Sequence, residues 1–156
     1  MRSPIILLVI ASILAVANAA NFKWDCRRSP ETCLNACFAY RVRRRPTTLV
    51  WDSPTKQQEG QRRRASGCTM SNSYSVCGAR SRVPYKRPGK TQCDEYPFAS
   101  TRQGGSNAIL RCVALRDNAS QGGQLGAFYG LATASGGCGG RAPCTFNVML
   151  TNTANM

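Results

Sequence analysis

The sequence predicts an α+β fold, a small disulfide-stapled domain with a short antiparallel sheet. Three observations predict it: nine cysteines in a chain of 156 residues, short segments of alternating polarity that are typical of strands, and two segments with helix signals. The part of the chain that follows an N-terminal leader, residues 20–156, has the length of one domain. We divide it into a Cys- and Arg-rich N-terminal part, 20–67, and a more regular core, 68–150.

Residues 1–19 have the three parts of a secretory signal peptide. Arg2 supplies the charge, Ile5 to Val16 form the apolar run, and Ala17-Asn18-Ala19 is a cleavage site. The run is too short for a membrane span, and no later segment has enough consecutive apolar residues. We therefore expect cleavage after Ala19 and a secreted, extracellular protein without stable membrane insertion.

All nine cysteines follow this leader, and a secreted chain uses them first for disulfides. Four pairs and one leftover thiol is the simplest account, and the sequence does not choose the pairing. Zinc is the alternative for the first three, but the oxidising compartment and the absence of His favour disulfides. The candidates are Cys26, Cys33, Cys37, Cys68, Cys77, Cys93, Cys112, Cys138 and Cys144.

The N-terminal part contains one predicted helix and one predicted strand. Ser29 as N-cap and Pro30 at the first helical position predict a short helix. Residues 41–64 are predicted to be loops around a strand at Thr48–Trp51. Two Arg runs, 43–45 and 62–64, suit phosphate contacts, but solvated loops or dibasic processing sites explain them equally well.

The second half has the predicted order strand, strand, helix, followed by a last strand. Gln121 to Leu131 is the predicted helix, with Leu125 and Phe128 at helical spacing. A Gly-rich loop follows, which a Cys138–Cys144 bond would close. The predicted strands are 73–77, 107–115 and 146–150, and residues 81–90 are predicted to be a basic loop.

The charge balance restricts the function. The chain has 21 basic residues, mostly Arg, against 7 acidic ones, a net charge of +14. Arg matches phosphate oxygens well, so nucleic acid or another polyanion is the predicted partner, with solubility as the alternative use of the charge. The chain has no His. This excludes Ser-His-Asp hydrolysis, two-histidine ribonuclease chemistry and His-ligated zinc, and leaves a carboxylate, Lys, Tyr or metal hydroxide as base.

Two segments are candidate sites. Asp94-Glu95 lies between Cys93 and the apolar Tyr96-Pro97-Phe98, which would fix the carboxylates, although acidic pairs in exposed turns are often without function. Asp117 to Gly123 suits a hard cation or a phosphate at a helix N-terminus. The alternatives are an ordinary turn or cap, and glycosylation of Asn118 in the sequon Asn118-Ala119-Ser120, which would exclude a metal there.

The stretch QCDEYPFASTRQGG (92–105), followed by Cys112-Val113 and NASQGGQLGAFY (118–129), resembles the NucA/NucB deoxyribonuclease family. The resemblance is greatest to its small secreted, cysteine-containing fungal-type members. Bacterial relatives carry D-R-D-E-W-P where this chain has Gln92 to Pro97. The resemblance covers residues 92–130 well and 68–150 loosely.

The resemblance implies an extracellular, metal-dependent endonuclease without sequence preference, acting on DNA or, as second choice, RNA, with a ββα-metal-like core. Glu95 stands where the wider nuclease group has its His base, and Asn118 stands where that group has a metal-binding Asn. The implied cofactor is Mg²⁺ or Mn²⁺, held through Asn118 with Asp94 in support. We expect a monomer. The candidate phosphate-binding residues are Arg102, Arg111, Arg116 and Gln121.

Gln92 and Cys93 depart from the family pattern, which has Asp and Arg at these positions. The alternative function is therefore a catalytically weak or inactive cationic protein that binds nucleic acid or another polyanion.

Overall fold

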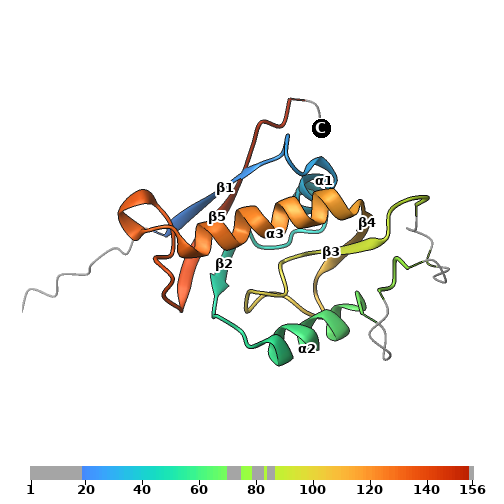
Figure 1. Cartoon of the computed structure of the whole chain (residues 1–156), viewed down its shortest axis with the longest axis horizontal. Helices are drawn as coiled ribbons and strands as arrows, with labels where there is room; N and C mark the ends of the chain where they lie inside the picture. The colour runs from blue at the N-terminus through green and yellow to red at the C-terminus, as the bar shows by residue number, and fades with distance from the viewer. Residues whose placement is uncertain (1–18, 70–74, 79–82, 84–86, 155–156) are drawn as a thin grey trace, which may run out of the picture.

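The computed structural model describes residues 19–69, 75–78, 83 and 87–154 (Figure 1). The predicted signal peptide lies outside the described residues except for Ala19. The fold is α+β, as predicted, and these described residues form three α-helices, two small sheets and one 3₁₀ turn at Thr133–Ser135.

A three-stranded sheet joins the two ends of the described chain. Strand β5 (Cys144–Thr151) lies in the middle, parallel to β1 (Ala20–Asp25) and antiparallel to β2 (Thr48–Trp51). The predicted strands at 48–51 and 146–150 are confirmed, whereas β1 was not predicted. Phe22 pairs with Val148, and Leu49 pairs with Phe146, so apolar side chains line the core face of this sheet.

In the second half, the predicted strand at 107–115 and the predicted helix are confirmed, but the strand that precedes them, at residues 92–96, was not predicted. Strands β3 (Gln92–Tyr96) and β4 (Ile109–Val113) form an antiparallel pair, and helix α3 (Leu115–Gly130) follows directly. Helix α3 begins six residues earlier than predicted. Its N-cap residue, Ala114, has no capping side chain, but its backbone N–H donates to Glu31 Oε2 at 2.8 Å. The cap comes from a distant segment, so the local sequence does not reveal it.

Helix α1 (Pro30–Arg41) starts where Ser29 and Pro30 predict. The Ser29 hydroxyl does not cap it; that oxygen accepts a hydrogen bond from Trp24 Nε1 at 2.8 Å. The buried face of α1 includes Cys33, Asn35 and Ala36, and it packs against β3 and β4. This contact places α1 beside the acidic pair of β3.

The prediction of loops throughout the flanks of Thr48–Trp51 is wrong, because helix α2 spans Lys56–Ser66. Thr55 and Gln58 form a capping box at its start, and Gly67 ends it in the left-handed conformation. The helix has no buried residue, so it lacks the apolar periodicity by which helices are recognised. The Arg62–Arg64 run therefore lies on the last turns of a helix.

The main core consists of aromatic side chains from both halves of the chain. Phe22 and Phe146 of the three-stranded sheet both contact Phe128 of α3, with ring centroids 5.3 and 5.1 Å apart. Trp24 and Tyr96 are fully buried in the same cluster. Within the described part of the chain, no helix is long and apolar enough to cross a membrane.

Four disulfides form, with one cysteine left over, as predicted. The pairs are Cys26–Cys33, Cys68–Cys93, Cys77–Cys112 and Cys138–Cys144, and Cys37 is the free thiol. Two of these bonds build a second, smaller core around β3 and β4. Part of the predicted strand 73–77 lies outside the described residues. Ser75 makes a single bridge to Thr69, and a turn follows it.

Replacing Cys68 and Cys93 together by Ala should lower the free energy of unfolding by about 2–4 kcal/mol, because the bond closes a loop in the unfolded chain. Urea denaturation of the oxidised proteins measures this difference. C37S is the matched control and should change stability little. A non-reducing peptide map that finds Cys37 in a disulfide would contradict the pairing.

Candidate functional site

Strand β3 buries two consecutive carboxylates, Asp94 at 3% and Glu95 at 6% exposure. Successive side chains of a strand point to opposite faces of the sheet. Asp94 therefore faces α1 together with Tyr96, and Glu95 faces α2 together with Cys93. The two acids are neighbours in sequence, but they have different partners.

Asp94 is held by α1. The side-chain amide of Asn35 donates to Asp94 Oδ2 at 2.8 Å and also to the Ile109 backbone carbonyl at 3.0 Å. Arg111 lies opposite Asp94 in the β3–β4 pair. Burial raises the pKa of Asp94 to about 7, and the hydrogen bond from Asn35 offsets only part of this rise. Asp94 thus lies in the interior and exchanges its proton near neutral pH.

Glu95 is held by α2. The Ser66 hydroxyl donates to Glu95 Oε1, and Arg63 Nη1 lies 3.6 Å from Oε2. Burial raises the pKa of Glu95, while the Ser66 hydrogen bond and the Arg63 charge act in the opposite direction. A buried carboxylate with a raised pKa is a better proton acceptor near neutral pH than an exposed one.

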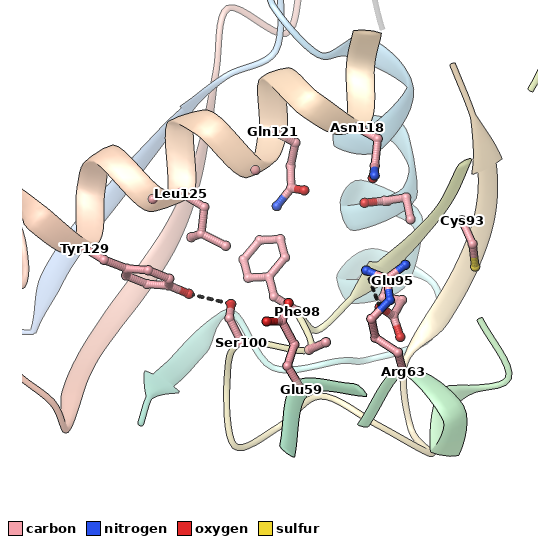
Figure 2. A pocket seen from close by; sticks show the side chains of 14 residues that line it. Glu59, Arg63, Cys93, Glu95, Phe98, Ser100, Asn118, Gln121, Leu125 and Tyr129 are labelled. Carbon is pink, nitrogen blue, oxygen red and sulfur yellow. Dashed lines mark hydrogen bonds and ion pairs between the residues drawn. The ribbon is translucent and has the colours of Figure 1, made fainter. Parts of the chain in front are cut away.

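Helix α3 forms the opposite wall of a pocket of about 240 Å³. Asn118, Gln121, Leu125 and Tyr129 follow one another at helical spacing on the face that lines it. Figure 2 shows Asn118 and Gln121 pointing from α3 into the space above Glu95 and Arg63. The other lining residues are Glu59, Arg63, Cys93, Asp94, Glu95, Phe98, Ala99, Ser100, Gly122 and Gly126.

The start of α3, and with it Asn118, is fixed by two exchanged hydrogen bonds between helix N-termini. The Glu31 backbone N–H of α1 donates to Asp117 Oδ2 at 3.0 Å, while Glu31 Oε2 accepts from the Ala114 N–H of α3. Carboxylates at helix N-termini also interact favourably with the helix dipoles. Asp117 is 2% exposed, so it is a cap rather than a pocket residue.

Four of the predicted site residues meet in this pocket: Asp94, Glu95, Asn118 and Gln121. The three predicted arginines do not line it. Arg102 is exposed near Asp52, Arg116 is exposed beside Asp117, and Arg111 lies on β4 opposite Asp94. Gly122 and Gly123 lie inside α3, not at its N-terminus, so the predicted backbone cradle for a phosphate does not form there.

Helix α2, which was not predicted, brings Glu59 and Arg63 to the pocket and Ser66 to Glu95. The available signal was the capping pattern of Thr55 and Gln58 before this segment. It was obscured by the run of three arginines, which is typical of a loop.

The pocket offers oxygen ligands that suit a hard cation. No group of three or more His, Cys, Asp or Glu side chains among the described residues forms a metal cluster. Mg²⁺, however, is commonly held by one or two protein oxygens and several waters. The carboxylates of Glu95 and Glu59 and the amide oxygens of Asn118 and Gln121 are donors of that kind. The donor set therefore fits Mg²⁺ or Mn²⁺, not a soft metal.

One family model matches the chain. The family described as Deoxyribonuclease NucA/NucB matches over residues 36–138, which run from the middle of α1 to Cys138 and include the whole pocket. No match was found among curated proteins.

The raised pKa of Asp94 predicts a pH-dependent stability. Its carboxyl has a pKa of 3.8 when unperturbed and about 7 in the fold, so the folded state binds this proton more tightly. Stabilisation from Asp94 is full below pH 3.8 and is lost as the pH rises through 7. In a chelating buffer, the melting temperature should fall between about pH 5 and about pH 8, and D94N should reduce that fall.

The control is D25N, because Asp25 is at the surface and its pKa is lowered, chiefly by the hydrogen bond from Asn152. This variant should keep the wild-type fall in melting temperature over the same range. Equal pH slopes for wild type and D94N would show that Asp94 does not hold its proton near neutral pH.

Proposed function

The chain belongs to the NucA/NucB deoxyribonuclease family, and on this basis we propose that it is a secreted, metal-dependent endonuclease that hydrolyses DNA without sequence preference. The observation that carries the proposal is the pocket. It combines Glu95 of the DEYP stretch on β3 with Asn118 and Gln121 of α3. One buried base and two amide side chains thus face a space large enough for a phosphate group.

Glu95 is the proposed general base. The chain has no His, and Glu95 is a buried carboxylate in the pocket whose pKa is raised by burial. In the proposed step, Glu95 takes a proton from a water molecule while the water oxygen forms a bond to phosphorus. The bond from phosphorus to the leaving sugar oxygen breaks, and that oxygen receives a proton from solvent. Ser66 holds one carboxylate oxygen and so fixes the direction of the other.

Asn118 is the proposed metal-binding residue, with Asp94 in support. When bound, Mg²⁺ or Mn²⁺ would stabilise the negative charge that develops on the phosphate oxygens. Asn118 lines the pocket from the first turn of α3, where the exchanged caps of Glu31 and Asp117 fix its position. This role leaves no room for a glycan on Asn118.

The substrate and location follow from charge and cysteine usage. A net charge of +14 favours a polyanion as partner, and the family implies a nucleic acid. We propose DNA as substrate, with RNA tested in parallel. Four disulfides in a small domain are consistent with an oxidising, extracellular compartment, to which the predicted leader would direct the chain.

A second candidate function is binding of nucleic acid without cleavage. The observation that favours it is the departure at Gln92 and Cys93 from the acidic and basic residues of bacterial relatives. Cys93 is committed to a disulfide with Cys68, so it does not replace an Arg functionally. A binder would keep its affinity for DNA when Glu95 is changed and when metal is removed.

E95Q should lower kcat for plasmid cleavage by about 10²–10⁴-fold, because it removes the base but keeps the shape of the side chain. A metal chelator should abolish cleavage by the wild type, and added Mg²⁺ or Mn²⁺ should restore it. Gel electrophoresis of DNA and RNA substrates measures both effects.

D25N is the matched control, because it makes the same acid-to-amide change at a partly exposed position that does not line the pocket. It should cleave DNA like the wild type. If oxidised wild-type protein leaves DNA and RNA intact with either metal, the binding function replaces the enzymatic one.

A further inference from the structure

Helix α2 forms one wall of the pocket, but it is attached to the rest of the protein by polar contacts. The three arginines at 62–64 on this helix lie in different environments. Arg62 donates from two nitrogens to Asp52, at 2.9 and 2.6 Å, and also donates to the Ala99 carbonyl at 3.2 Å. These bonds use Arg62 to hold the helix in place. Arg64 is exposed and does not line the pocket.

Arg63 has a different environment from both neighbours. Among the described residues that line the pocket, it is the only cation, beside the acids Glu59, Asp94 and Glu95. Its side chain is 36% exposed. Its Nη1 lies 3.6 Å from Glu95 Oε2, which is an ion pair but is longer than a hydrogen bond. No side-chain hydrogen bond of Arg63 occurs among the described residues, so its guanidinium donors are available to a ligand.

The guanidinium donors of Arg63 favour an anionic ligand, although three of the four charged residues that line the pocket are acids. A phosphodiester entering a space lined by three acids would be repelled unless a cation faces it. Arg presents a planar set of donors that matches two phosphate oxygens, and charge-assisted bonds of this kind are strong. The ion pair with Glu95 is the contact that such a phosphate would displace.

We propose that Arg63 is a catalytic residue that binds the scissile phosphate, and that its move from Glu95 to the phosphate leaves Glu95 Oε2 free to accept the proton of the attacking water. The proposal rests on the proposed function. Ser66 lies three residues later on the same helix face and keeps its hydrogen bond to Oε1, so Glu95 stays oriented when Arg63 leaves it. Substrate binding and exposure of the base are then a single event.

The other arginines suggested by the sequence are less suited to this role. Arg102 is 58% exposed and lies 3.9 Å from Asp52, and Arg116 is 88% exposed and lies 3.7 Å from Asp117. Both lie outside the pocket lining. They can raise the local concentration of DNA, but neither faces Glu95.

The test compares R63A, R63Q and R63K with R64A. Loss of the phosphate contact should lower kcat/KM for a short DNA duplex by roughly 10²–10³-fold in R63A and R63Q. R63K should recover part of the loss, because it keeps the charge without the planar donors. R64A removes the same charge from the neighbouring, exposed position and should stay within about threefold of wild type.

Chemical rescue separates a catalytic role from a structural one. Guanidinium added at a non-denaturing concentration should restore cleavage by R63A at least tenfold, because the small cation can occupy the space left by the side chain. It should not stimulate R64A or wild type. Melting curves check that each variant is folded, and R63Q keeps the length of the side chain if R63A is unstable.

Two outcomes distinguish this proposal from the proposed function. If wild type cleaves DNA, E95Q does not, and R63A equals R64A without rescue, the role of Arg63 is overturned while the nuclease function stands. If wild type does not cleave, the affinity for a phosphodiester oligonucleotide, measured in the presence of chelator, still tests whether Arg63 binds a phosphate. Weaker binding by R63A and R63Q than by R64A supports it, and equal binding overturns it.

Discussion

The candidate site depends on how helix α1 braces the strand–strand–helix unit. Asn35 in the middle of α1 bonds to Asp94 on β3 and to the backbone of β4, and Glu31 at its start exchanges caps with α3. Each of these groups is polar and largely removed from water. Leaving one of them without its hydrogen bond would therefore cost more free energy than a hydrogen bond at the surface contributes. One helix thereby fixes the strand that carries the acids relative to the helix that carries Asn118.

Helix α2 completes the pocket, and polar contacts rather than a buried face hold it in place. It has no buried face, and Arg62, Arg63 and Ser66 connect it to Asp52 and Glu95. Arg63 is the more exposed of the two arginines, and it lies 3.6 Å from Glu95 without a hydrogen bond, so its contact can be exchanged for one with a charged ligand. The pocket thus joins a rigid half, braced by α1, to a half whose contacts a phosphate can replace.

Local signals predicted the elements that depend on local physics. Ser29 and Pro30 marked the start of α1, and strand patterns marked β4 and β5. Strand β3 was not predicted, because two consecutive acids are unusual in a strand with both faces buried. The start of α3 was missed because its cap comes from Glu31, and α2 was missed because no apolar residue gives it a period. Within the site, the family resemblance named both Glu95 and Asn118, and both line the pocket. The place of Arg63 could not be predicted, since its contact depends on how α2 docks beside β3.

The bond between Cys68 and Cys93 connects the residue just beyond α2 to the residue just before Asp94. In a reducing cytoplasm these two thiols would stay separate, and only polar contacts such as those of Arg62 and Ser66 would join the pocket wall formed by α2 to the rest of the protein. Oxidation would therefore make the pocket more rigid. For a protein proposed to be secreted and to degrade DNA, the site would reach its full rigidity only outside the reducing compartment that holds the genome of the producing cell.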